Sequence, residues 1–355
     1  MKVAVDCRMI SDSGIGCYLS NILYYLVNNK SISFLLIGDP NKLKKYEKTD
    51  NCQILPVSIP IFSLKELFFF PVREINQCDI FYSPNYNIPL GIKIPILSTI
   101  HDVLFLDIPE ISSRFKRVIN YVYIKRVINS SRLVFTVSNF SKERIQYHFP
   151  KALHLAVTYN GVSDSLLQYN YIDGDRYFSF PYFLYVGNIK PHKGLKCLLD
   201  AYSVIEKKSN YKRKLVIVGK KENFKTPDNY IQEFIRKEDI DNIVFTGYVS
   251  DEVLRRIMAE ADLLIQPSIY EGFGIPPLEA MILGTPALIS DIPVFKEIYS
   301  DFPVDYFRCN DVVDLIQKIE SCSYKRICLN SELVEKYSYK KSSRIILNII
   351  QSIVE

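Results

Sequence analysis

The sequence predicts an α/β protein of two domains, each with a parallel β-sheet that helices cover on both faces. Short apolar runs rich in Val, Ile and Phe alternate with amphipathic segments along most of the chain. This rhythm of strand, helix and strand is typical of parallel sheets, whose strands are buried on both faces. The chain has 355 residues, enough for two domains of ordinary size, and 48% of them are hydrophobic.

Strand candidates recur through both halves of the chain, with helix candidates between nearly all of them. In the first half they are Val3–Asp6, Phe34–Ile37, Ile54–Val57, Ile80–Ser83, Ile96–Ile100, Leu133–Val137 and Leu155–Tyr159. In the second half they are Phe183–Val186, Leu215–Val218, Ile243–Phe245, Leu263–Gln266 and Ala287–Ser290.

The rhythm breaks once, at the polar and aromatic segment Ser163–Phe180. We therefore expect a Rossmann-like domain over residues 1–165, a linker over 166–180 and a second Rossmann-like domain over 181–330. A last helical pattern, over 331–355, has no strand after it. We expect this helix to cross back and pack on the first domain.

Composition excludes several classes of protein. The formal net charge of +5 comes without a long Lys/Arg run, so nucleic acid is not an expected partner. No stretch approaches the roughly 18 uncharged apolar residues of a membrane span. Met1-Lys2 leads straight into Val3–Asp6, for which we expect a buried first strand and not a signal peptide. The eight cysteines are scattered singly, which favours reduced thiols in a cytoplasmic protein over disulfides or a zinc site.

The run Glu271-Gly-Phe-Gly-Ile-Pro-Pro-Leu-Glu279 is the most informative part of the chain. A strand precedes it and a helix is expected to start at Pro276 or Pro277. Such a junction directs free backbone N–H groups at one spot, which attracts anions and hydroxyl oxygens, and two carboxylates add acceptors for sugar hydroxyls. An ordinary strand–turn–helix with two solvated glutamates gives the same spacing.

A second glycine-containing turn follows the first strand, with Gly14 and Gly16 before a helix that begins near Cys17. Two glycines there suggest close approach by a phosphate or sugar. Asp39, after the second strand, resembles the ribose-binding acid of an NAD enzyme. Leu19 occupies the place of the third glycine in the dinucleotide motif, which weighs against that alternative.

Two further turns follow predicted strands, where ligands of open α/β sheets gather. His101 lies just past the strand that ends at Ile100, and there it can donate a hydrogen bond or carry a proton, or be a loop histidine bonded to local backbone. In the segment 185–194, a lysine before a helix can hold a diphosphate as a point charge. Lys190 and His192 are expected at the exposed rim of this turn.

Two acidic pairs match the loose D-x-D pattern of metal-dependent sugar transferases, Asp173-Gly-Asp175 and Asp239-Ile-Asp241. Neither follows a strand, so solvated turns are the expected reading.

The segment Ser112–Ser130 is expected to form a helix with Phe115, Val118, Ile119 and Val122 on one side and no acidic residue. With the Phe68–Phe70 run, this helix could contact an anionic membrane surface. A helix whose apolar side faces the core and whose basic side faces water has the same pattern.

Together these motifs resemble the retaining glycosyltransferases of family 4, the group 1 glycosyltransferases with a GT-B fold. The resemblance covers nearly the whole chain and is densest over Tyr185–Glu297. It implies two Rossmann-like domains whose parallel sheets face each other across a cleft. Further matching landmarks are Thr99-Ile-His101-Asp-Val, Val137-Ser-Asn-Phe-Ser141 and Tyr159-Asn-Gly161-Val162.

The resemblance also implies roles for named residues. Glu271 lies by the donor sugar, Glu279 binds the ribose, Lys193 binds the diphosphate, and His101 is on the acceptor side. Asn188 stands where the family often has an arginine, which puts its role in doubt. We expect His101, Lys193 and Glu271 to be catalytic, and the substrate-binding residues to be Gly14, Gly16, Asn188, Val249, Gly272, Phe273, Gly274, Ile275, Leu278 and Glu279.

The resulting hypothesis is a metal-independent, retaining hexosyltransferase without a cofactor, for which the nucleotide sugar is a substrate. The acceptor is expected to be a glycan or a lipid-linked glycan of surface polysaccharide or O-antigen type. The mannosyltransferase branch is the most similar, which makes GDP-mannose the first donor to test. We expect a cytoplasmic protein, peripheral on the inner face of the membrane if the basic helix contacts it. The alternatives are a sugar-nucleotide epimerase of the same fold, a nicotinamide-dependent oxidoreductase and a non-catalytic nucleotide-binding partner.

Overall fold

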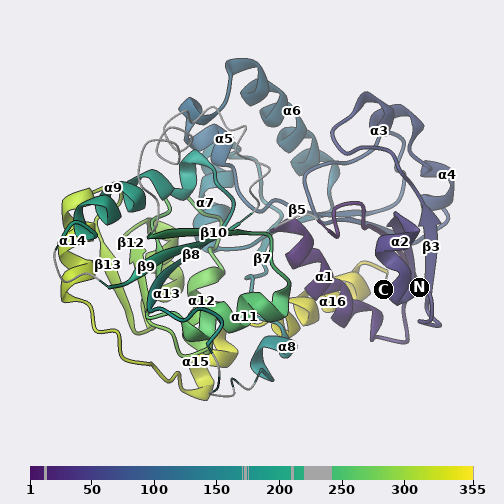
Figure 1. Cartoon of the computed structure of the whole chain (residues 1–355). Helices are drawn as coiled ribbons and strands as arrows, with labels where there is room; N and C mark the ends of the chain where they lie inside the picture. The colour runs from purple at the N-terminus through teal and green to yellow at the C-terminus, as the bar shows by residue number, and fades with distance from the viewer. Residues whose placement is uncertain are drawn as a thin grey trace. The chain divides into compact units, whose positions relative to one another are not determined.

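The computed structural model, shown in Figure 1, describes residues 1–11, 14–169, 171, 174, 176–208, 212–219 and 242–354. The chain forms two compact units, one of Met1–Ser163 with Tyr337–Glu355 and the other of Asp164–Lys336. The segment 166–180, expected as a linker, belongs to the second unit because Arg176 and the N–H of Tyr177 both bond to Glu260, each at 2.7 Å.

The first unit contains one parallel sheet of seven strands in the order β3-β2-β1-β4-β5-β6-β7. The strands are β1 (Lys2–Asp6), β2 (Ser33–Gly38), β3 (Cys52–Pro56), β4 (Ile80–Ser83), β5 (Ile96–Thr99), β6 (Leu133–Thr136) and β7 (Leu155–Val157). All four residues of β4 and of β5 are buried, as in a sheet covered on both faces. The strand order reverses between β1 and β4, and at such a point ligands of doubly wound sheets bind.

The helices of the first unit follow its strands along the chain. They are α1 (Ile15–Val27), α2 (Pro40–Leu43), η1 (Lys44–Tyr46), α3 (Leu64–Phe69), α4 (Val72–Ile75), α5 (Leu104–Asp107), η2 (Pro109–Ile111), α6 (Arg114–Ser130), α7 (Asn139–His148) and α16 (Tyr339–Val354). Helix α16 lies along α1, near the end of the chain marked C in Figure 1, and Ser343 Oγ donates to the carbonyl of Ile22 at 3.4 Å.

The terminal helical pattern is two helices in the structure. The shorter one, α15 (Ser331–Lys336), belongs to the second unit, where Lys336 Nζ lies 2.6 Å from Asp301 Oδ2. Tyr337 and Ser338 separate the two helices, and Ser338 pairs with Val162 as an isolated parallel bridge. Only α16 therefore returns to the first unit.

The second unit contains a parallel sheet of six strands in the order β10-β9-β8-β11-β12-β13. The strands are β8 (Tyr182–Val186), β9 (Lys214–Val218), β10 (Ile243–Gly247), β11 (Leu263–Gln266), β12 (Ala287–Ser290) and β13 (Val304–Phe307). The helices are α8 (Asp164–Leu167), η3 (Pro191–Lys193), α9 (Leu195–Ile205), α11 (Asp251–Glu260), α12 (Pro276–Ile282), α13 (Pro293–Tyr299), α14 (Val312–Ser321) and α15. The predicted α/β class with two parallel-sheet domains is confirmed.

The pairing of β8 with β11 positions the site of the second unit. Leu263 aligns with Phe183 and Leu264 with Leu184, so the two strands end at the same edge of the sheet. The turn after β8 and the loop after β11 therefore emerge side by side. Strand order also reverses here, because β9 lies on one side of β8 and β11 on the other.

Candidate functional site

The turn after β8 and the loop after β11 are joined by backbone hydrogen bonds. The carbonyl of His192 accepts from the N–H of Ile269 at 2.8 Å and from that of Tyr270 at 3.3 Å. Gly194 has φ +67°, and a Cβ on it would lie 1.8 Å from the carbonyl oxygen of Pro267. Only glycine fits that approach, so Gly194 fixes the distance between the two loops.

This junction brings Lys193 and Glu271 into contact, although they are 78 residues apart in the sequence. Lys193 Nζ lies 2.7 Å from each carboxylate oxygen of Glu271. The Glu271 side chain is 9% exposed and that of Lys193 is 22% exposed, so the pair is buried at one end and open to water at the other. An ammonium has three N–H donors, so Lys193 keeps one for a ligand while it bonds both oxygens.

Glu271 has a further partner that the sequence did not reveal. Ser268 Oγ donates to Glu271 Oε1 at 2.8 Å and itself accepts from the carboxamide of Gln266 at 2.9 Å. All three side chains are buried. The available signal was a hydroxyl residue three positions before the glutamate, a spacing too common to mark a site.

The loop 272–275 supplies backbone donors, but helix α12 does not, contrary to the sequence-based expectation. Its first two residues, Pro276 and Pro277, have no N–H, and the N–H groups of the next two both donate to the carbonyl of Ile275. Within the described part of the chain, no group accepts from the N–H of Gly274 or of Ile275. Free donors therefore lie in the loop before the helix.

Two residues of this element have side chains that face the core. Leu278 is completely buried and Phe273 is 2% exposed, so the role expected for Phe273 would fall to its backbone. The N–H of Leu278 donates to the carbonyl of Ile275 at 2.9 Å. Gly272 and Gly274 are partly exposed, and the carbonyl of Gly274 accepts from the hydroxyl of Tyr299.

Glu279 lies in the first turn of α12, partly exposed, where it faces the start of α11. Removal from water raises the pKa of its carboxyl to about 7, the nearby Asp251 carboxylate raises the pKa further, and Arg255 opposes the shift. Val249 lies two residues before Asp251, at the same edge of the sheet. Glu279 is therefore a carboxyl that changes charge near neutral pH.

The turn after β8 holds the other residues expected there. Asn188 is partly exposed, and its carbonyl accepts from the hydroxyl of the buried Tyr185 at 3.3 Å. Lys190 is exposed, as expected for the rim. His192 is less exposed than expected, and burial together with the Lys193 ammonium lowers the pKa of its imidazole to about 4. It is therefore neutral at pH 7.

His101 lies at the carboxyl end of β5 in the first unit. Its Nε2 is 3.0 Å from the carbonyl of Pro84, which can only accept, so Nε2 carries the proton and Nδ1 is an acceptor. The ring meets Tyr18 edge-on at 4.8 Å, and burial lowers the pKa of the imidazole to about 4. At neutral pH the side chain can thus accept a hydrogen bond from a hydroxyl. Its one N–H is already bonded to the carbonyl of Pro84, as in the alternative of a loop histidine bonded to local backbone.

The glycines of the first turn serve the fold locally. Gly14 precedes α1 with φ +75°, and a Cβ on Gly16 would lie 2.6 Å from the carbonyl of Met9. The close approach that Gly16 permits is therefore to its own chain, not to a ligand. Asp39 accepts from the N–H of Asn41 at 2.9 Å and caps α2, which is a structural role in place of ribose binding.

Metal binding and membrane crossing are each addressed by one observation on the described residues. Asp173, Asp175, Asp239 and Asp241 lie outside the described residues. Within the described ranges, no group of three or more His, Cys, Asp or Glu side chains is placed to hold a metal ion. Across the same part of the chain, no helix combines the length and the apolar character needed to cross a membrane.

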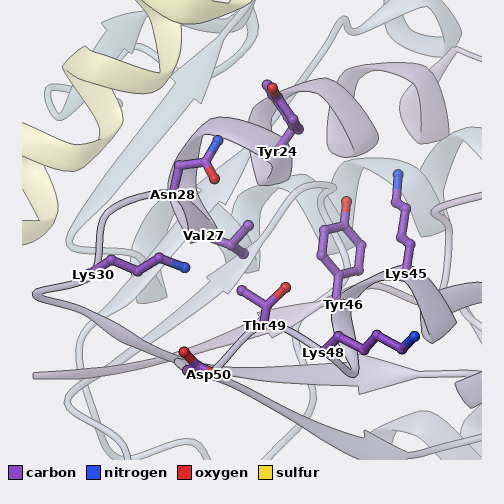
Figure 2. A pocket seen from close by; sticks show the side chains of 9 residues that line it. All are labelled: Tyr24, Val27, Asn28, Lys30, Lys45, Tyr46, Lys48, Thr49 and Asp50. Carbon is purple, nitrogen blue, oxygen red and sulfur yellow. The ribbon is translucent and has the colours of Figure 1, made fainter.

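The first unit also holds a pocket of about 380 Å³, and none of the candidate site residues discussed above lines it (Figure 2). Its lining residues are Tyr24, Val27, Asn28, Lys30, Lys45, Tyr46, Lys48, Thr49 and Asp50. Lys30 and Asp50 precede β2 and β3, so the pocket lies at the amino ends of strands, whereas His101 follows the carboxyl end of β5.

Comparison with known proteins gives a family match in the second unit. Residues 177–337 match the model of the family described as glycosyl transferases group 1. O-antigen chain mannosyltransferase B of Escherichia coli is 27% identical over 234 residues, which cover 62% of this chain and 59% of that protein. O-antigen chain mannosyltransferase RfbU of Salmonella typhimurium is 30% identical over 217 residues, or 59% of this chain and 56% of that protein. The matches thus span less than two thirds of the length of either relative.

Solved structures show the same fold at low sequence identity. Sucrose-phosphate synthase from Thermosynechococcus elongatus aligns with a TM-score of 0.77 at 16% identity, covering 100% of this chain and 99% of that chain. Anabaena HepE, in complex with UDP and glucose, aligns with a TM-score of 0.73 at 17% identity, covering 99% of this chain and 100% of that chain. The fold is thus the GT-B fold of these proteins. The family model of the group 1 glycosyltransferases thus matches residues 177–337, and the chain is similar to the two mannosyltransferases named above.

Proposed function

We propose that this chain is a retaining hexosyltransferase of family 4 that transfers mannose from a GDP-linked donor to a glycan or lipid-linked acceptor. The acceptor belongs to surface polysaccharide biosynthesis of the O-antigen type, as in the two named relatives. The observation that carries the proposal is the contact between Lys193 and Glu271 at the carboxyl edge of the second sheet.

Transfer breaks an anomeric C–O bond and leaves a nucleoside diphosphate with new negative charge. In this proposal, the remaining N–H of Lys193 and the N–H groups of Gly274 and Ile275 bind that charge as it develops. Interactions that strengthen in the transition state lower the barrier, and one such donor is typically worth about 3–4 kcal/mol. These groups stabilise the leaving diphosphate without a metal ion.

The two carboxylates bind different parts of the donor. Glu271 is held beside Lys193 and accepts from hydroxyls of the sugar, while Glu279 faces α11 and accepts from the ribose. Val249, which precedes α11, lies by the base. His101 accepts from a substrate hydroxyl through Nδ1, since its Nε2–H is bonded to Pro84.

The acceptor is proposed to lie at an anionic membrane surface that α6 contacts. Phe115 is 74% exposed, Val118 60% and Val122 56%, so the alternative in which this stripe faces the core is wrong. The helix carries Arg114, Lys116, Arg117, Lys125 and Arg126 and no acid. Phe68 and Phe69 of α3 are exposed as well. Apolar side chains flanked by lysine and arginine suit the headgroup region of an anionic bilayer.

The test of the transferase proposal is a screen of nucleotide sugars for thermal stabilisation, followed by transfer assays with the best binder. A donor held at about a hundred times its dissociation constant should stabilise the protein by ~2.7 kcal/mol. Lys193→Met and Glu271→Gln should abolish transfer while the variants remain folded. Full activity of either variant would overturn the assignment. Turnover of the donor without any acceptor would indicate an epimerase, and binding of NAD with no nucleotide-sugar binding would indicate an oxidoreductase.

The membrane proposal is tested by sedimentation with vesicles of phosphatidylglycerol or of phosphatidylcholine alone. Binding should require the anionic lipid and weaken with salt. Val118→Ser with Val122→Ser should reduce binding, while Val313→Ser, which alters a valine that is 62% exposed on α14, should not. Equal binding by all variants would show that α6 is not the contact.

A further inference from the structure

The buried chain of polar side chains that ends on Glu271 extends the site to residues that do not touch a ligand. Gln266, the last residue of β11, is 1% exposed, and Ser268, two residues later at the carboxyl edge of the sheet, is completely buried. Ser268 Oγ lies 2.8 Å from Glu271 Oε1, and Gln266 Nε2 lies 2.9 Å from Ser268 Oγ.

The direction of these bonds follows from the groups themselves. A carboxylate can only accept, so the single proton of the Ser268 hydroxyl must point at Glu271. A lone pair of Ser268 Oγ is then left for Gln266, which must present its N–H₂ group and not its carbonyl. The order of donation therefore runs from Gln266 through Ser268 to Glu271.

The backbone of Ser268 is fixed independently of its hydroxyl. Its carbonyl accepts from Ser290 Oγ at the end of β12, which ties the loop to the sheet. The hydroxyl of Ser268 is therefore carried on a rigid segment, whereas Lys193 reaches Glu271 through a long side chain that is 22% exposed. Of the two groups that hold the carboxylate, Ser268 is the one that stays in place.

We propose that Ser268 is a positioning residue that keeps the Glu271 carboxylate oriented toward the donor sugar, and that Gln266 orients Ser268. This inference rests on the proposed function, in which Lys193 also binds the diphosphate. When the ammonium shares its N–H groups with phosphate oxygens, its hold on Glu271 weakens. The Ser268 hydroxyl then retains the carboxylate at the sugar.

The test compares Ser268→Ala with Thr285→Val in the full chain. Each removes one completely buried hydroxyl from the second unit, but the Thr285 hydroxyl donates to the carbonyl of Met258, so only the first variant loses a contact with the carboxylate. A hydrogen bond to a charged group predicts a fall in kcat of about tenfold to a hundredfold for Ser268→Ala. The nucleoside diphosphate without sugar should bind this variant as it binds the unaltered protein. Thr285→Val should keep kcat within about twofold, and Gln266→Met should lower kcat less than Ser268→Ala.

The outcomes separate this inference from the proposed function. If the unaltered protein transfers sugar and Ser268→Ala has the same kcat, the positioning role is wrong. Equal loss of affinity for nucleotide sugar and for nucleoside diphosphate in Ser268→Ala would show a structural role and would also overturn the inference. Recovery of kcat in Ser268→Thr, which restores the hydroxyl, would support it. If the unaltered protein binds no nucleotide sugar, the proposed function itself fails, and the inference fails with it.

Discussion

The energetic role of the Lys193–Glu271 pair can be measured without any substrate. Lys193→Met leaves the Glu271 carboxylate, whose side chain is 9% exposed, with Ser268 as its remaining donor. Stranding one member of a fully buried pair costs about 3–5 kcal/mol. Because Lys193 is 22% exposed and Ser268 remains, we expect about 2 kcal/mol here.

The reverse change should cost less. Glu271→Gln keeps an oxygen that can accept from Ser268, and the ammonium of Lys193 can turn to water, so we expect about 1 kcal/mol. In the double variant Lys193→Met, Glu271→Gln, no charge is buried at the junction. Its destabilisation should match that of Glu271→Gln alone, which gives a coupling energy of about 2 kcal/mol.

Differential scanning calorimetry of the four proteins at pH 7 measures these differences. For a unit of 150–250 residues, about 1 kcal/mol corresponds to a Tm change of about 2–4 °C. The Lys193→Met transition should therefore fall by about 4–8 °C and that of the double variant by about 2–4 °C. If the double variant falls by the sum of the two single variants, the residues do not interact and the geometry of the site is wrong.

Three further perturbations test other parts of the structure. Because the pKa of Glu279 is raised to about 7, its neutral form stabilises the fold below pH 4.5 and that stability is lost as pH rises through 7. Glu279→Gln should therefore raise the Tm relative to the unaltered protein at pH 8 and leave it unchanged at pH 4. Gly194→Ala should destabilise the second unit by about 3 kcal/mol or more and abolish transfer, since its Cβ would overlap the carbonyl of Pro267; an unchanged Tm would contradict this. Arg8→Leu should destabilise the first unit by about 3–5 kcal/mol in denaturant melts, because it strands two buried carboxylates, Asp6 and Glu66. A loss below 1 kcal/mol would show that water reaches them.

Apolar periodicity predicted most of the fold because strands and helices are set by local pattern. Two elements were predicted incorrectly, and each has a physical reason. Strand β13 was missed since its residues, Val304–Phe307, alternate around Asp305 at the edge of the sheet and do not form a continuous apolar run. The terminal helix was predicted as one because its break at Ser338 depends on a pairing with Val162, which is distant in the sequence.

The candidate site was predictable only where residue type and strand position coincided. Glu271 follows a strand within a glycine-containing run, which marks it without knowledge of the fold. Ser268 has no such signal, and its contact with Glu271 appears only once the loop is folded. His101 was placed correctly at the end of a strand, yet its tautomer depends on the carbonyl of Pro84, 17 residues earlier. Sequence patterns place a residue at the end of a strand. The direction of its hydrogen bonds depends on partners that only the folded structure brings to it.

The charge of the Lys193–Glu271 pair has a consequence for donor binding. The pair is neutral as a whole, and Asn188 adds no charge where the family often has an arginine. In the proposed function, a diphosphate then meets mainly N–H groups of Lys193, Gly274 and Ile275, so its affinity should depend only weakly on salt. Asn188→Arg would add a cation that can bind two phosphate oxygens, and we expect about tenfold tighter donor binding with a steeper salt dependence. Titration calorimetry between low and high salt measures both effects. Steep salt dependence in the unaltered protein would show that a free cation, and not the neutral pair, binds the diphosphate.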